Sequence, residues 1–323
     1  MEIYIDKDNL LSYIRSAKSD AFIDCQRWFK KNADIYFRFS KEDIRTDSDI
    51  MEWIKTLTEG YETISPKWES KFPLTPLKSN THKSFNKRQL SAMYFISDEN
   101  INKREEEGNI LYVPKGKEID YIFSLIFEDY QYTICKDPRK FKSWDDINIS
   151  PTPCSDIIVA DRYIFSNIEL LKSNLYKILK HLCSKVKRSI VNIVIFTKGD
   201  KDCCYKDIIS EIKKLIKDTI GQEPKVTIVP SAMKQEHDRT IFSNYMSYNS
   251  GDSFNYFDSS NNIITKGRNV YIKSNASKEN LNSSLQFVEN MQQIVKSLIE
   301  GNNAESIIGD KKCNYIRFEL QKD

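Results

Sequence analysis

The hydrophobic positions in the second half of the chain follow two different spacings. Apolar residues fill 157–160 and all of 191–196 except Asn192, which is typical of strands that are buried on both faces. Over 168–182 and 206–220, apolar residues instead recur every three or four positions, which is the spacing of one face of an α-helix. Strands that alternate with helices predict an α/β fold with parallel strands and right-handed crossovers.

The pattern continues toward the C-terminal end of the sequence. It predicts strands over 225–229, 269–272 and 315–320, and a long helix over 279–300. The half-apolar stretch 240–248 predicts one further strand, which ends at a glycine turn. We therefore expect a mixed sheet flanked by helices over 154–323.

The first part of the chain mixes short strands and helices. The pattern predicts strands at 1–5, 35–39, 110–113 and 132–135, and helices at 10–14, 19–32, 47–58 and 120–127. The segment 90–97 is either a buried strand or a short helix. Prolines and a charged cluster near 137–152 indicate a domain boundary. The expected organisation is a smaller mixed α/β domain over 1–145, followed by the larger α/β domain.

The charge balance and the apolar runs of the sequence bear on whether the protein binds nucleic acid or spans a membrane. Lysine and arginine number 49 against 46 acidic residues, a net charge of +3, so nucleic-acid binding would need a local basic patch. One candidate is a lysine-rich loop over 65–87 with interleaved Trp68 and Phe85, which is either simply solvated or contacts a phosphate backbone. The sequence contains no apolar run long enough for a membrane span and no signal-peptide pattern at its start.

The seven cysteines are scattered and form no C-x-x-C pair. Zinc is therefore not expected, no other cofactor is indicated, and reduced thiols in a cytoplasm are the simplest interpretation. The abundance of lysine, isoleucine and asparagine is typical of an AT-rich genome and suggests a bacterial source.

Candidate chemistry is concentrated at His237-Asp238-Arg239. Residues two apart on a strand point to the same face, so His237 and Arg239 are predicted to project together. A histidine can act as nucleophile or general acid, and a guanidinium binds phosphate oxygens. The pair predicts a site for a phosphoryl group.

This spacing resembles the phospholipase D superfamily, whose motif reads His-x-Lys, four residues, Asp, six residues, Gly-Ser. In this chain the five slots fall on His237, Arg239, Asn244, Gly251 and Asp252. The resemblance covers about 154–317, where the predicted strands match the family's first three. The segment is also similar to the phospholipase-D-like C-terminal domain of MIT-domain proteins, in which a His-Asp-Arg segment serves binding and not hydrolysis.

The family's reaction implies a phosphohistidine intermediate and a second histidine that protonates the leaving oxygen. The chain holds one copy of the motif, and His82 and His181 lack its context, so two copies of His237 would have to meet in a homodimer. Asn244 has no charge to stabilise an imidazolium, and Asp252 places a negative charge where a phosphate donor is expected. His237 is then a catalytic residue, a partly buried structural histidine, or part of a retained phosphate site.

A second group of polar residues, Asp161-Arg162-Tyr163, follows the first strand of the larger domain. Ligands of open α/β sheets bind at the carboxyl ends of the strands. We expect Arg162 to converge with Arg239 on one anion there, with Asp161 nearby. The alternative is a structural ion pair between Asp161 and Arg162.

These residues favour a degenerate phospholipase-D-like protein that binds a phosphate-bearing ligand, with nucleic acid as the first candidate. One alternative is a metal-independent phosphodiesterase or nuclease that acts as a homodimer through His237. Another is a protein-interaction component of a bacterial multi-protein system such as phage defence, which rests on composition and domain layout alone.

Overall fold

The computed structural model describes residues 1–16, 19–59, 67–68, 92–95, 110–126, 130–134, 141–147, 152–184, 186, 190–199, 203–231, 239–265 and 268–319. The chain divides into two compact units. The first comprises Met1–Glu128 with Ser274–Asn282, and the second Asp129–Lys273 with Ser283–Asp323. The division thus lies earlier in the chain than the expected boundary near 145, and a short segment from the C-terminal half joins the first unit.

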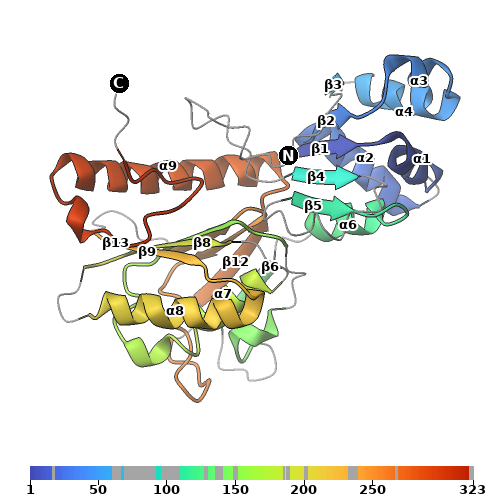
Figure 1. Cartoon of the computed structure of the whole chain (residues 1–323). Helices are drawn as coiled ribbons and strands as arrows, with labels where there is room; N and C mark the ends of the chain where they lie inside the picture. The colour runs from blue at the N-terminus through green and yellow to red at the C-terminus, as the bar shows by residue number, and fades with distance from the viewer. Residues whose placement is uncertain are drawn as a thin grey trace. The chain divides into compact units, whose positions relative to one another are not determined.

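The first unit contains a five-stranded, all-parallel sheet in the order β3-β2-β1-β4-β5 (Figure 1). Its strands are β1 (Glu2–Ile5), β2 (Asp34–Phe37), β3 (Lys67–Trp68), β4 (Ala92–Phe95) and β5 (Ile110–Val113). Its helices are α1 (Lys7–Arg15), α2 (Asp20–Asn32), α3 (Lys41–Arg45), α4 (Ser48–Thr58) and α6 (Glu118–Ile126). The ambiguous segment 90–97 therefore contains a strand.

Aromatic packing joins the helices of this unit to its sheet. The ring of Trp53 on α4 lies edge-on to Phe29 of α2 at 6.0 Å, to Tyr13 of α1 at 6.1 Å and to Phe37 of β2 at 6.2 Å between centroids. All four side chains are buried. Edge-to-face pairs of this kind add to the stabilisation from apolar burial.

The second unit contains an eight-stranded mixed sheet in the order β13-β9-β8-β7-β10-β11-β12-β6. The strands are β6 (Tyr130–Ile134), β7 (Asp156–Ala160), β8 (Asn192–Thr197), β9 (Lys225–Pro230), β10 (Arg239–Ser243), β11 (Met246–Ser250), β12 (Arg268–Ser274) and β13 (Ile308–Gly309). β7, β8 and β9 are parallel, whereas β10 runs antiparallel to β7. The predicted α/β class, with a mixed sheet flanked by helices, is confirmed.

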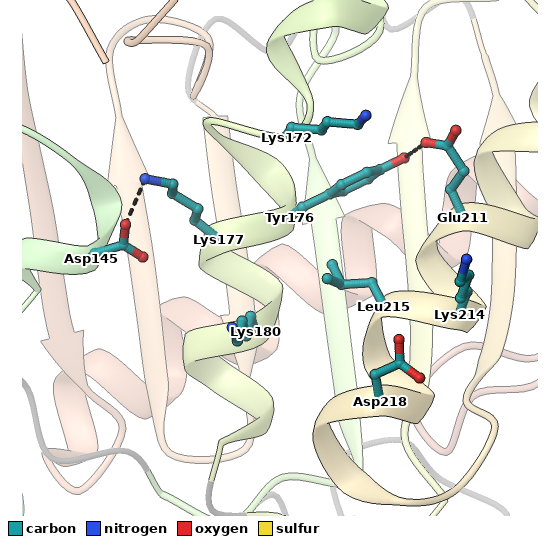
Figure 2. A pocket seen from close by; sticks show the side chains of 9 residues that line it. All are labelled: Asp145, Lys172, Tyr176, Lys177, Lys180, Glu211, Lys214, Leu215 and Asp218. Carbon is teal, nitrogen blue, oxygen red and sulfur yellow. Dashed lines mark hydrogen bonds and ion pairs between the residues drawn. The ribbon is translucent and has the colours of Figure 1, made fainter. Parts of the chain in front are cut away.

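Two helices, α7 (Leu175–Cys183) and α8 (Tyr205–Ile220), lie side by side on one face of this sheet, and their facing side chains border a groove (Figure 2). The third helix, α9 (Lys278–Glu300), follows β12. α8 ends where the sequence predicts, because Gly221 adopts a left-handed backbone with φ 76°. No helix in the described part of the chain combines the length and the apolar character that crossing a membrane requires.

The helix predicted over 168–182 begins later than expected. Residues 168–170 form a 3₁₀ turn, and α7 starts only after Asn174. The buried amide of Asn174 accepts hydrogen bonds from Trp144 Nε1 at 2.9 Å and from the backbone N–H of Tyr256 and Phe257, both at 3.0 Å. Its Nδ2 donates to the Phe257 carbonyl at 2.7 Å. Tertiary hydrogen bonding thus sets the start of this helix.

The stretch 240–248 is a hairpin and not the single predicted strand. β10 and β11 pair antiparallel, with Thr240 opposite Asn249. The turn between them contains no glycine or proline, the usual sequence signals of a reversal. A hydrogen-bonded, buried asparagine at 244 holds the turn instead.

The strand predicted over 315–320 is also wrong, since 315–319 contain no strand in the structure. Tyr315 and Ile316 are apolar and buried because they pack against the second unit's core, with Tyr315 edge-on to Phe242 at 5.4 Å. Backbone pairing occurs earlier, where β13 adds to β9.

Candidate phosphate-binding site

Four of the predicted site residues lie at one edge of the eight-stranded sheet: Asp161, Arg162, Arg239 and Asp252. β7 ends at Ala160, which pairs with Thr240 at the start of the antiparallel β10. Arg239 in turn pairs with Ser250 at the end of β11. The register therefore brings the segments that begin at Asp161 and Gly251 next to Arg239, at the carboxyl end of the parallel strands. Ligands of α/β sheets bind at such an edge.

Two guanidinium groups lie against one aromatic ring at this edge. The Cζ atom of Arg162 is 5.4 Å from the ring centroid of Tyr163, and that of Arg239 is 5.8 Å from the same centroid. Both separations are within cation–π range. Tyr163 as a whole residue is 39% exposed, so part of it faces solvent. The structure thus brings Arg162 and Arg239, which are 77 residues apart by their numbers, to a common place.

Backbone contacts position the two arginines. The carbonyl of Arg162 accepts hydrogen bonds from Lys198 N at 3.1 Å and from Thr197 Oγ1 at 3.3 Å, which tie it to the end of β8. Arg239 Nη1 donates to the Gly251 carbonyl at 3.3 Å. Arg162 Nε is buried and hydrogen bonds to no described residue. The backbone of Arg162 is therefore held while its side chain retains an uncommitted donor.

Asp161 is completely buried and lies near enough to Arg239 to feel its charge. Its carboxylate accepts from Tyr163 N at 2.9 Å, and from Ser253 Oγ and Phe254 N, both at 2.8 Å. Burial raises the pKa of Asp161, and these hydrogen bonds and the charge of Arg239 only partly oppose that rise. It makes no ion pair with Arg162, so the alternative of a structural Asp161–Arg162 bridge is wrong. Asp161 instead fastens the 161–163 and 251–254 loops together.

Asp252 occupies the slot that holds serine in the phospholipase D motif. Its Oδ1 accepts from Ser253 N at 2.9 Å, and its backbone N–H donates to Ser250 Oγ at 3.1 Å. The residue is half-buried and shapes the turn that follows β11. Its neighbour Gly251 has open space where a side chain would begin, so glycine is not required there for steric reasons.

Asn244 does not belong to this site. It follows the last residue of β10, at the opposite end of the strand from Arg239, about 16 Å away for an extended chain. Its Oδ1 accepts from Ser155 N at 2.9 Å and its Nδ2 donates to Tyr315 Oη at 3.0 Å, and the residue is completely buried. We therefore correct its assignment as a catalytic residue.

His237 and Asp238 lie outside the described residues, and so does most of the lysine-rich loop 65–87. Tyr163 was not among the residues expected to bind a ligand, although its position directly after Arg162 was a usable signal. Ser253 and Phe254 gave no such signal, since their contribution depends on a fold that places them above Asp161.

No protein-family model matches this chain, and neither does any curated protein. Within the part of the chain that the structure describes, no group of three histidine, cysteine or acidic side chains is arranged to hold a metal ion. What the described residues offer at this edge is two guanidinium groups beside one partly exposed tyrosine. Such a combination can bind phosphate oxygens through the guanidinium groups and stack a planar base on the ring.

Proposed function

We propose that the second unit binds a phosphate-bearing ligand, with nucleic acid as the ligand class, through Arg162, Tyr163 and Arg239. The observation that carries the proposal is the approach of both guanidinium groups to the ring of one partly exposed tyrosine. Guanidinium binds phosphate oxygens bidentately and keeps its charge at any physiological pH. The ring beside it offers the stacking surface that single-stranded nucleic acids use.

The surroundings favour binding over hydrolysis. A catalytic histidine needs a neighbour that orients it and stabilises its charged form. Asn244, the residue in the motif's aspartate slot, is buried at the other end of β10. Asp161 is held by three hydrogen bonds from neutral groups. Bacterial origin, cytoplasmic location and a part in phage defence stay predictions from composition.

The direct test is binding of labelled single-stranded DNA, RNA and duplex DNA, followed by fluorescence anisotropy. The double substitution Arg162→Ala/Arg239→Ala should weaken binding about tenfold or more and lower the slope of log affinity against log salt by about 1.4 for single strands. The matched control is Arg27→Ala/Arg45→Ala, which removes two exposed arginines of the first unit. Equal affinity of the Arg162→Ala/Arg239→Ala protein and the wild type would overturn the proposal.

The same samples distinguish binding from turnover. Incubation of the labelled strands with protein in EDTA should leave their length unchanged on a denaturing gel. Cleavage that survives EDTA and disappears in His237→Ala would replace the binding proposal with the homodimeric phosphodiesterase, whose reaction needs no metal.

A further inference from the structure

A second candidate site lies in the groove between α7 and α8. The groove has a volume of about 560 Å³, within the range of about 300–1,000 Å³ that is usual for small-molecule sites. Figure 2 shows side chains from both helices facing it. Those that matter for recognition are Lys172, Tyr176, Lys180, Glu211, Lys214 and Leu215.

A hydrogen bond spans the groove and fixes its walls. The hydroxyl of Tyr176 on α7 donates to Glu211 Oε2 on α8 at 2.8 Å (Figure 2). Burial and the neighbouring carboxylate raise the pKa of the Tyr176 hydroxyl, so it stays protonated and keeps this bond at neutral pH. Tyr176 is buried and Leu215 half-buried. Together they form an apolar floor that does not have to be assembled when a ligand enters.

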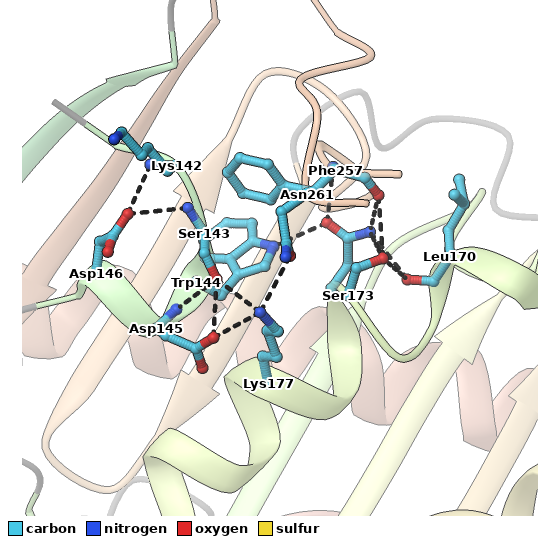
Figure 3. Close-up of polar contacts among 11 residues, drawn as sticks. Lys142, Ser143, Trp144, Asp145, Asp146, Leu170, Ser173, Lys177, Phe257 and Asn261 are labelled. Atoms are coloured by element: carbon cyan, nitrogen blue, oxygen red, sulfur yellow. Dashed lines mark hydrogen bonds and ion pairs between the residues drawn. The ribbon is translucent and has the colours of Figure 1, made fainter. Parts of the chain in front are cut away.

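The lysines that border the groove differ in whether their ammonium groups already have ion-pair or hydrogen-bond partners. Lys177 pairs with Asp145 at 2.5 Å and also donates to Asn261 at 3.1 Å, so its ammonium is already occupied (Figure 3). Lys172, Lys180 and Lys214 make no ion pair within 4 Å in the described part of the chain, and Lys180 acts on Asp145 only at longer range, where it helps to lower the pKa of that carboxyl. Each ammonium offers three hydrogen-bond donors and a full positive charge. The groove therefore combines uncommitted cations with a prearranged apolar floor.

The two walls differ in chemistry. Two of the three uncommitted ammonium groups, those of Lys172 and Lys180, come from the α7 side. The α8 side adds the carboxylates of Glu211 and Asp218, which accept hydrogen bonds from hydroxyl or amino groups. A complementary ligand carries a phosphate at one end, an apolar ring in the middle and hydroxyl or amino donors beside it.

We propose that the groove between α7 and α8 binds a nucleotide. The phosphate contacts the ammonium groups of Lys172 and Lys180, the base lies over Tyr176 and Leu215, and sugar or base donors face the α8 carboxylates. This site is separate from Arg162 and Arg239, which do not line the groove. It does not depend on the proposed nucleic-acid binding.

The test is isothermal titration of the full-length protein with AMP, adenosine and inorganic phosphate. AMP should bind about tenfold or more tightly than either part, because the phosphate is recognised by Lys172 and Lys180 and the base by the apolar floor. Lys172→Gln/Lys180→Gln should weaken AMP binding about tenfold, since it removes two charged donors. The matched control Lys206→Gln/Lys217→Gln removes two exposed α8 lysines outside the groove and should leave AMP affinity unchanged.

Two further variants separate the groove from general surface charge and from the arginine site. Leu215→Trp fills the floor without altering any charge and should abolish AMP binding. Arg162→Ala/Arg239→Ala should bind AMP as the wild type does. The proposal is overturned if AMP does not bind at about millimolar concentration, if Leu215→Trp binds it normally, or if the control pair weakens it as much as the groove pair does. Loss of AMP binding in the arginine variant would assign the nucleotide to the edge of the sheet instead.

Discussion

Asn244 Nδ2 donates a hydrogen bond to the hydroxyl of Tyr315 at 3.0 Å, which joins the β10–β11 turn to a segment 71 residues later in the chain. Both residues are completely buried. Oδ1 of Asn244 accepts from the backbone N–H groups of Ser155 and Asp156 at the start of β7, and Nδ2 also donates to Ser155 Oγ. One amide therefore holds together the turn, the first strand of the parallel group and the C-terminal segment.

This arrangement predicts that Asn244 matters for stability and not for ligand binding. Asn244→Ala leaves buried partners unsatisfied and should lower the free energy of unfolding by about 2–4 kcal/mol. Asn244→Asp, which restores the phospholipase D motif, should destabilise about as much, because it buries a carboxylate and removes the donor to Tyr315. Urea denaturation measures both effects.

The control for this prediction is Asn249→Ala, since Asn249 pairs with Thr240 on the same hairpin but is only half-buried. It should cost about 1 kcal/mol or less. Increased phosphodiesterase activity in Asn244→Asp, with normal stability, would show that residue 244 acts in catalysis after all.

Two glycines provide a matched pair for a second prediction. Gly309 in β13 has φ 107°, and a Cβ there would collide with the carbonyl oxygen of Val226 in the neighbouring strand. Gly309→Ala should therefore destabilise by about 2–4 kcal/mol. Gly251→Ala meets open space without a positive φ and should change stability by about 0.5 kcal/mol or less. Thermal unfolding of the two variants checks the difference, and equal melting temperatures would contradict it.

Elements that are set by the local spacing of apolar residues could be predicted from the sequence, whereas elements that are set by distant hydrogen bonds could not. β7 and β8 were predictable because strands buried on both faces are mostly apolar, and α8 because its inward residues follow the helical spacing up to Gly221. The hairpin at Asn244 was not predictable, because its turn depends on side-chain hydrogen bonds to residues 88 and 89 positions away.

The residues of the candidate site also differ in whether their placement could be predicted from the sequence. The rule that ligands bind at the carboxyl ends of strands led to the expectation that Arg162 and Arg239 converge on one anion. In the structure both guanidinium groups lie near the Tyr163 ring, and convergence on an anion stays a prediction. The role of Asp161 could not be foreseen, since an aspartate next to an arginine in sequence suggests an ion pair. It is the fold that brings Ser253 and Phe254 close enough to donate hydrogen bonds to the carboxylate of Asp161.

A third prediction concerns pH and the bridge between Lys213 and Asp310. Asp310 Oδ2 lies 2.9 Å from Lys213 Nζ and accepts from Val226 N at 2.8 Å. Burial acts to raise the pKa of Asp310, but the bonds from Lys213 and Val226 outweigh it and hold that pKa below its ordinary value of 3.8. Burial acts to lower the pKa of Lys213, but the carboxylates of Asp310 and Glu223 outweigh it and hold that pKa above its ordinary value of 10.5.

The folded state therefore binds fewer protons at Asp310 than the unfolded state does in acid. The stabilisation of the folded state by ionised Asp310 is complete above about pH 4 and is lost as the pH falls through the folded pKa of Asp310. For Lys213 the stabilisation is complete below about pH 10 and is lost as the pH rises through its folded pKa. Asp310→Asn should cost about 1–2 kcal/mol at pH 7 and flatten the acid limb of a stability–pH profile. Glu305→Gln, which changes an exposed carboxylate outside the bridge, should leave the profile unaltered.

The last prediction separates charge from stacking at the arginine pair. If nucleic acid stacks on Tyr163, Tyr163→Ala should weaken binding of single-stranded DNA by about 1–3 kcal/mol, whereas Tyr163→Phe keeps the ring and should bind as the wild type does. Because the ring carries no charge, Tyr163→Ala should leave the salt dependence of binding nearly unchanged, in contrast to Arg162→Ala/Arg239→Ala. Anisotropy titrations at several salt concentrations measure both quantities. A loss of affinity in Tyr163→Phe equal to that in Tyr163→Ala would assign the effect to the hydroxyl and would remove stacking from the mechanism.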